Sequence, residues 1–161
     1  MAVPRRQHRP PGILLQPGDG PNADLVFLAN VDHDDWARLI DHAERRRFRR
    51  GDVIVEAGDV DRSLWIVVSG SLELFLPHDR KPFVSIGRHS IVGEMAFLDG
   101  RPRSATIKAS TDGELLRLTF SAFGVLAARH PVLGREILLD LGRILAIRLE
   151  RTNRELERHS G

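Results

Sequence analysis

The chain of 161 residues is the size of one ordinary domain, and its 42% hydrophobic and 29% charged residues are typical of a folded globular protein. It has no cysteine, which excludes disulfides, iron–sulfur clusters, cysteine-ligated zinc and thiol nucleophiles. Its 24 Lys and Arg against 22 Asp and Glu give a formal charge of +2, all of it within residues 1–23, so the remainder is balanced and no DNA partner is expected.

The first elements in chain order are a tail and a short helix. Residues 1–23 contain five prolines and three glycines, which suit neither a helix nor a sheet, so we expect a disordered tail before a folded domain at 24–161. Asp32 is a suitable N-cap, and apolar residues from Trp36 onward follow it at helical spacing. The pattern predicts a short amphipathic helix over about residues 33–43.

A β-rich region follows, over about residues 45–119. Apolar and polar residues alternate there with period two, and glycines recur at intervals that suit turns. The alternating segments Leu64–Val68 and Leu72–Leu76 flank the turn sequence Ser69–Ser71, which predicts two strands joined there. Many short strands must protect their edges, and closure is the usual solution. We therefore expect a small β-barrel or jelly roll, that is, a double-stranded β-helix.

Helical spacing returns after residue 120 and predicts C-terminal helices over about residues 121–158. Ser121–Arg129 favours one short helix, and Pro131 suits the first turn of a second helix of roughly 25 residues. The long helix carries an apolar stripe at intervals of four residues or multiples of four, which suits core packing or a helical partner and predicts a homodimer through this helix. The stripe comprises Leu133, Ile137, Leu141, Leu145, Leu149 and Leu156. The predicted fold class is mainly β with α-helices, with a short N-terminal and a long C-terminal helix flanking the barrel.

No segment predicts membrane association or secretion. Apolar runs such as Leu64–Val68 are far shorter than the ~20 residues needed to cross a bilayer. Ile13–Leu15 is too short to serve as the apolar part of a signal peptide. The sequence therefore predicts a cytoplasmic protein with no membrane partner.

Residues 93–106 depart from the strand pattern and suggest an anion site. Gly93 lets the backbone approach a ligand closely, and the next five residues are good helix formers, so a short helix can direct free N–H groups at an oxyanion. Arg103 has a planar fork that suits two phosphate oxygens, and Ser104 adds a hydroxyl donor. The carboxylate of Glu94 would repel a phosphate unless the same ligand also presents hydroxyl groups. A sugar phosphate does both.

This segment closely resembles the phosphate-binding cassette of cyclic-nucleotide-binding domains, as in bacterial catabolite activator proteins and regulatory subunits of cyclic-AMP-dependent kinase. It combines Gly93-Glu94 with a small residue two places after the glutamate, Pro102-Arg103 at an interval of eight, and Ser-Ala-Thr thereafter. Residues 48–54 and 64–70 also resemble barrel strands of that family, so the resemblance covers about residues 25–156. It implies the family's fold and a regulatory domain that binds a cyclic nucleotide.

By that resemblance, Glu94 would accept the ribose 2′-hydroxyl and Arg103 would pair with the cyclic phosphate. The family's long C-terminal helix covers the base, which assigns Thr152 and Asn153 to base contact. Val92 stands where an aromatic residue often precedes the Gly-Glu pair. The resemblance thus predicts cyclic AMP as the ligand, with cyclic GMP as the alternative. The expected ligand-binding residues are Gly93, Glu94, Met95, Ala96, Arg103, Ser104, Ala105, Thr152 and Asn153.

Other functions have less support in the sequence. The seven histidines include no His-x-His or His-x-x-x-His pair, so no metal and no other cofactor is expected. No serine lies in a Gly-x-Ser-x-Gly frame, so hydrolase chemistry lacks support and no catalytic residue is assigned. The arginine-rich run 45–50 follows Glu44 and alternates between two strand faces, which predicts a solvated surface rather than a nucleic-acid site.

The sequence therefore predicts a sensor and not an enzyme. The chain ends at Gly161, which leaves no room for the helix-turn-helix domain of the family's transcription factors. The expected output is movement of the C-terminal helix, read by an effector protein or by a homodimer partner. The alternative is an interaction module that keeps the fold without ligand, in which Glu94 and Arg103 form a structural ion pair.

Overall fold

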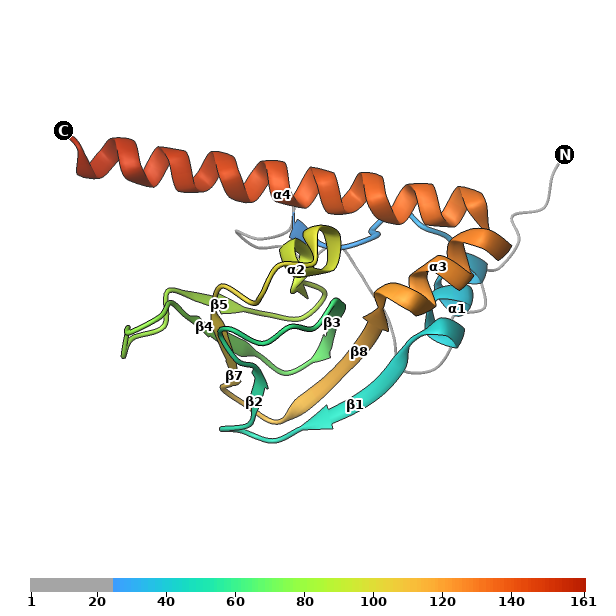
Figure 1. The fold of residues 1–161 in the computed structure, drawn as a ribbon, viewed down its shortest axis with the longest axis horizontal. Helices are drawn as coiled ribbons and strands as arrows, with labels where there is room; N and C mark the ends of the chain where they lie inside the picture. Colours follow the sequence, from blue (N-terminus) through green and yellow to red (C-terminus); the bar gives the residue numbers. More distant parts are fainter. Residues whose placement is uncertain (1–24) are drawn as a thin grey trace, which may run out of the picture.

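A computed structural model describes residues 25–161, so the tail predicted for residues 1–23 lies outside the described residues. Within the described part, two four-stranded antiparallel sheets pack against each other and four helices flank them (Figure 1). The inner sheet has the strand order β1-β8-β3-β6, and the outer sheet has the order β2-β7-β4-β5. In chain order the elements are α1 (His33–His42), β1 (Glu44–Phe48), β2 (Val53–Val55), β3 (Ser63–Ser69), β4 (Leu72–Phe75), β5 (Val84–Ile86), β6 (Ile91–Val92), α2 (Glu94–Asp99), β7 (Thr106–Ala109), β8 (Gly113–Thr119), α3 (Phe120–Arg129) and α4 (Pro131–His159).

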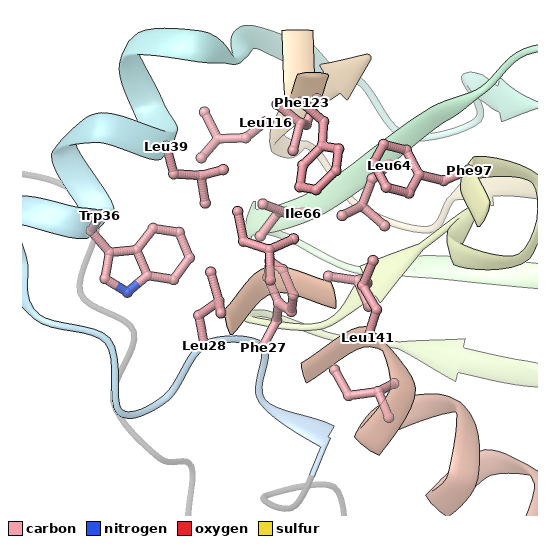
Figure 2. Close-up of a cluster of buried hydrophobic side chains, with 14 of the residues drawn as sticks. Phe27, Leu28, Trp36, Leu39, Leu64, Ile66, Phe97, Leu116, Phe123 and Leu141 are labelled. Atoms are coloured by element: carbon pink, nitrogen blue, oxygen red, sulfur yellow. The ribbon is translucent and has the colours of Figure 1, made fainter. Parts of the chain in front are cut away.

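Strand β3 is buried on both faces and joins two hydrophobic cores. Leu64, Ile66 and Val68 belong to the core between the inner sheet and the helices. Trp65 and Val67 belong to the core between the two sheets. Alternate side chains of a strand point to opposite faces, so one apolar run fills both cores. Figure 2 shows the first core, where helix residues Trp36, Leu39, Phe97, Phe123 and Leu141 surround Leu64 and Ile66.

The predicted jelly roll, mainly β with a short N-terminal and a long C-terminal helix, is confirmed. The sheets do not close into one barrel: within residues 25–161, β1 and β6 end the inner sheet while β2 and β5 end the outer sheet. Side chains between the two sheets supply the core that a closed barrel would enclose.

The two strands joined by the turn at Gly70, β3 and β4, do not pair with each other. Strand β3 pairs with β6 and β8, whereas β4 pairs with β5 and β7, so the chain changes sheet here. Gly70 has φ +81°, and a Cβ at this position would lie 2.5 Å from the Asp112 carbonyl oxygen. The local alternation predicted both strands, but the close approach to Gly113 decides which strands pair.

Two helices begin where Asp32 and Pro131 predicted, and a third is capped by Thr119, which the sequence analysis did not single out. Asp32 caps α1 by accepting a hydrogen bond from the Asp35 N–H at 2.8 Å. Thr119 caps α3 in the same way through the Ala122 N–H. Pro131 opens α4, which is 29 residues long, somewhat longer than expected. No helix within residues 25–161 combines the length and apolarity needed to cross a membrane.

The apolar stripe of α4 divides between the core and the surface. Leu133, Ile137 and Leu141 are buried as expected, whereas Leu149 is 63% exposed and Leu156 is 62% exposed. A residue four places along a helix is rotated by about 40° from the first, so a stripe with this spacing winds off the packed face. The first half of α4 is therefore a core helix and the second half carries an uncovered apolar face.

The segment before α1 holds the first half of α4 in place. The Leu28 N–H donates to the Asp140 carboxylate at 2.7 Å, and the Arg143 guanidinium donates to the Val26 carbonyl oxygen at 2.9 Å. Phe27 is fully buried between them in the core shown in Figure 2. Helix α2 lies beneath the middle of α4 (Figure 1).

Candidate functional site

A cavity of about 690 Å³ lies between α2, the loop that follows it, the outer sheet and the second half of α4. The loop and α2 supply Gly93–Ala96 and Arg101–Ala105, and α4 supplies Arg148, Arg151, Thr152 and Glu155. An apolar wall faces them from the outer sheet and its β4–β5 connection, formed by Val55, Leu74, Leu76, Phe83, Val84, Ile86 and Ile107. The segment predicted as an anion site therefore forms one side of a cavity that a distant helix completes.

Gly93 is required at the start of α2 for two reasons. Its φ of +83° is a left-handed conformation that side chains rarely adopt, and a Cβ here would overlap Nη1 of Arg103. The predicted short helix begins at the next residue, Glu94, and ends at Asp99, where Gly100 closes it with φ +70°. The N–H groups of its first turn have no acceptor within the helix. They lie in the part of α2 that lines the cavity.

Arg103 is buried at the base of the cavity, with 5% of its surface exposed. Nη1 donates to the Gly93 carbonyl oxygen at 3.0 Å, and Nη2 donates to the Ser63 carbonyl oxygen at 2.7 Å. Nη2 also lies 3.5 Å from the Asp61 carboxylate. Nε is the one guanidinium nitrogen of Arg103 that makes no hydrogen bond to the described residues. The guanidinium is thus fixed in orientation through both Nη atoms, while the buried Nε–H is left unsatisfied.

Asp61 links Arg103 to a second arginine. Its other carboxylate oxygen accepts hydrogen bonds from the Ser63 hydroxyl at 2.8 Å and from Nη2 of Arg117 at 3.2 Å. Burial raises the pKa of Asp61, but the hydrogen bond from Ser63 and the charges of Arg117 and Arg103 outweigh it, so the pKa lies below its ordinary value. Asp61 is therefore ionised at neutral pH and keeps Arg103 oriented.

Glu94 forms an ion pair with a residue of the long helix. Its carboxylate accepts a hydrogen bond from Nη1 of Arg148, whose Nη2 donates to the Ile91 carbonyl oxygen at 2.8 Å. Glu94 is 8% exposed and lines the cavity. The ion pair of Glu94 with Arg103, considered as a structural alternative, is not the arrangement found, because each residue has a different partner. Arg148 thereby ties α4 to both α2 and strand β6.

Of the two residues on α4 that were expected to contact the base, Thr152 lies at the cavity and Asn153 does not. Thr152 lines the cavity, and its hydroxyl donates to the Arg148 carbonyl oxygen at 3.0 Å. Asn153 is exposed and does not line the cavity, because it lies about 100° beyond Thr152 on the side of the helix away from Arg148 and Arg151. Arg151 and Glu155, which the sequence reasoning missed, line the cavity beside Thr152. Arg151 lies three residues after Arg148 and Glu155 lies three residues after Thr152, and this spacing is the signal that would have placed them on the same face.

Eight of the nine predicted ligand-binding residues line this cavity. They are Gly93, Glu94, Met95, Ala96, Arg103, Ser104, Ala105 and Thr152. Among residues 25–161 there is no group of three or more His, Asp or Glu side chains placed to hold a metal ion. The polar groups that converge on the cavity are instead guanidinium groups, carboxylates and the free N–H groups of a helix start, which together suit a ligand with both an anionic group and hydroxyls.

Related proteins bind or respond to cyclic nucleotides according to their names. The cyclic AMP receptor protein of Thermus thermophilus is 31% identical over 121 residues, which are 73% of this chain and 54% of that protein. A cAMP-dependent protein kinase regulatory subunit of Emericella nidulans is 27% identical over 100 residues, which are 62% of this chain and 24% of that protein. The chain therefore spans about half or less of the length of these two relatives.

Solved structures and a family model agree with these relatives. The crystal structure of the Thermus thermophilus catabolite activator protein superposes with a TM-score of 0.70 and 29% identity, over 81% of this chain and 61% of that one. A family model described as the cyclic nucleotide-binding domain matches residues 45–130, more than half of the chain. Apart from Glu44, the first residue of β1, these residues include all the strands of the described part of the chain, together with α2 and Arg103. The chain belongs to the cyclic nucleotide-binding domain family.

Proposed function

We propose that this protein binds cyclic AMP in the cavity and that Arg103 holds the cyclic phosphate. The observation that carries the proposal is the state of Arg103, which is buried, lines the cavity and has an Nε–H without a partner among the described residues. A buried charged donor without an acceptor is costly, and a phosphate oxygen is the strongest acceptor for a guanidinium.

The charges around the cavity suit a monoanion. Four arginines and three carboxylates line it: Arg101, Arg103, Arg148 and Arg151 against Glu94, Asp99 and Glu155. A cyclic phosphate carries one negative charge, whereas the open phosphate of 5′-AMP carries about two at neutral pH. In this proposal Glu94 would accept a ribose hydroxyl, which an inorganic anion lacks. The charged residues that line the cavity therefore favour a cyclic nucleotide over a free phosphate or an open-chain nucleotide.

Cyclic AMP is preferred because the Thermus and Emericella relatives carry cyclic AMP in their names. Cyclic GMP is the second candidate, and Arg151 is the observation that favours it. A guanidinium donates well to O6 and N7 of guanine, whereas adenine offers an amino group at the equivalent position of O6. Glu155 can accept a hydrogen bond from the exocyclic amino group of either base.

Thermal unfolding with and without nucleotide tests the proposal. Cyclic AMP at ~100 times its dissociation constant is expected to add about 2.7 kcal/mol to the free energy of unfolding, which raises the Tm of a chain of this size by about 5–10 °C. The Arg103→Ala variant serves as the control and should show a much smaller shift at the same nucleotide concentration. An unchanged Tm of the wild-type protein with both cyclic AMP and cyclic GMP would favour the interaction module.

We infer that the output is carried by α4, in a protein that is regulatory rather than catalytic and acts on an effector protein. The ion pair between Arg148 and Glu94 connects the ligand-binding helix to α4, and the ribose hydroxyl would share the carboxylate with Arg148. Ligand binding therefore changes the contacts that hold the second half of α4. A cytoplasmic location stays a prediction of the sequence.

The uncovered face of α4 also suits a homodimer. The row Leu138, Gly142, Leu145, Leu149, Thr152 and Leu156 has alternating intervals of four and three residues, and its leucines at 138, 149 and 156 are 44%, 63% and 62% exposed. This spacing is that of the contact positions of a two-helix coiled coil. We therefore propose that two copies pair through this row.

Removal of residues 147–161 is expected to weaken cyclic AMP binding by about 10- to 100-fold, because Arg148, Arg151, Thr152 and Glu155 are lost while the phosphate contacts remain. Sedimentation should show a shift toward the monomer. Leu149→Glu is the matched control, since it disrupts the row but does not line the cavity: it should produce monomers that still bind. Full affinity in the truncated protein would exclude α4 from the binding site.

A further inference from the structure

Arg62 bridges the end of α2 and the start of α3. Its Nε and Nη2 donate to the Phe97 carbonyl oxygen at 3.1 and 3.0 Å, and Nη2 also donates to the Leu98 carbonyl oxygen at 2.9 Å. The same guanidinium lies over the Phe120 ring, 3.5 Å from its centroid. We propose that Arg62 is a positioning residue of the nucleotide site, an inference that rests on the proposed function.

Helix α2 needs such support because it has only six residues. An isolated helix of this length is unstable in water, and the carbonyl groups of its last turn lack partners within the helix. Arg62 satisfies two of these carbonyls with a charged donor and places a positive charge at the negative end of the helix dipole. Gly100 leaves room for this side chain, since a Cβ there would lie 3.3 Å from Cδ of Arg62. The opposite end of α2 carries Glu94 and the free N–H groups at the cavity.

Residues on both sides of Arg62 hold the other half of the site. The Asp61 carboxylate and the Ser63 carbonyl oxygen both accept from Arg103. Three consecutive residues, Asp61 and Arg62 just before β3 and Ser63 as its first residue, therefore contact the two parts of the proposed phosphate site: the arginine and the short helix. Because β3 is a buried central strand of the inner sheet, this support is rigid.

Arg62 also gives α2 a connection to the C-terminal helices. Its carbonyl oxygen accepts from the Phe120 N–H at 2.9 Å, at the first residue of α3. The Phe120 ring packs against the Phe97 ring with centroids 5.5 Å apart, and Phe97 also contacts Phe123 of α3 (Figure 2). Helix α3 packs on α4. A shift of α2 on ligand binding therefore reaches α3 through the guanidinium stacked on Phe120.

Hydrogen–deuterium exchange on the full chain, combined with calorimetry, tests this role. Arg62→Met keeps the aliphatic part of the side chain and removes the guanidinium, while Arg62→Lys keeps the charge and removes the planar fork. In the ligand-free Arg62→Met protein, exchange of the Phe97 and Gly100 amides of α2 should accelerate while exchange in β8 stays unchanged. Cyclic AMP should bind about tenfold more weakly, and its effect on exchange in α3 should be lost. Arg62→Lys should restore little of either.

Arg45→Met is the matched control, since it removes an exposed arginine paired with Glu114 far from α2 and should match wild type. Unchanged α2 exchange in ligand-free Arg62→Met would overturn the inference, as would equal acceleration in α2 and β8, which indicates global destabilisation.

If Arg62→Met does not fold, Phe120→Leu is the second variant, since it removes the ring on which the Arg62 guanidinium stacks. It should reduce the effect of cyclic AMP on exchange in α3 alone. An unaltered effect in α3 would overturn the proposed connection between α2 and α3. Failure of wild type to bind any nucleotide would contradict the proposed function, but the ligand-free exchange result would still stand.

Discussion

Replacement of Arg103 by alanine is expected to abolish measurable cyclic nucleotide binding. The variant loses charge-assisted hydrogen bonds to a phosphate in a buried site, worth roughly 2–5 kcal/mol, which corresponds to about 30-fold to several thousand-fold in affinity. Isothermal titration calorimetry measures the loss. Arg103→Lys should recover little, because an ammonium group cannot reproduce the contacts of the planar fork.

Two controls keep this test specific. Arg101→Ala removes an arginine that also lines the cavity, but this side chain is 84% exposed, so the change in affinity should be small. In Arg103→Ala the Gly93 and Ser63 carbonyl groups lose a hydrogen-bond donor. Circular dichroism is therefore needed as a folding control, and we expect it to show that the Arg103 variants remain folded. Unchanged affinity in a folded Arg103→Ala protein would mean that the phosphate binds elsewhere or does not bind.

Replacement of Glu94 by glutamine is expected to weaken cyclic AMP binding by about 10- to 100-fold. The carboxylate would accept the ribose 2′-hydroxyl and also pairs with Arg148, so the amide loses both a charged acceptor and the tie to α4. Titration of wild type and variant with cyclic AMP and 2′-deoxy cyclic AMP completes a double-mutant cycle. Removal of the 2′-hydroxyl from the ligand should lower its affinity for the variant much less than it lowers its affinity for wild type.

Glu150→Gln is the control for the Glu94 cycle. Glu150 lies on α4, is exposed and pairs with Arg154 without lining the cavity, so its replacement should leave affinity and the deoxy effect unchanged. If the effects of the Glu94 replacement and of the missing hydroxyl are simply additive, Glu94 does not contact the ribose. Its role would then be confined to holding Arg148.

Local patterns in the sequence predicted much of the fold. Period-two alternation located the strands, and Asp32 and Pro131 located the ends of two helices, because caps and alternation depend on neighbouring residues. Long-range packing decided the rest. Strand pairing at Gly70 depends on contacts with residues 112–113, and the exposure of Leu149 depends on where the core ends beneath α4.

The candidate site divides in the same way. The contiguous segment from Gly93 to Ala105 could be identified because its chemistry lies within thirteen residues of sequence. Arg148 lies 54 residues from Glu94 and Asp61 lies 42 residues from Arg103, and no spacing rule relates residues so far apart. Asn153 was assigned by resemblance alone, and the turn of α4 directs Glu155 rather than Asn153 to the cavity.

Calorimetric titration of the wild-type chain with cyclic AMP, cyclic GMP and 5′-AMP tests the central claim most directly. A cavity with a single buried arginine for phosphate should bind a cyclic monoanion and reject the extra charge and longer reach of 5′-AMP. The predicted result is one site per chain for cyclic AMP, weaker binding of cyclic GMP and no measurable binding of 5′-AMP. Equal affinity for all three nucleotides, or no heat with any of them, would contradict a dedicated cyclic nucleotide site.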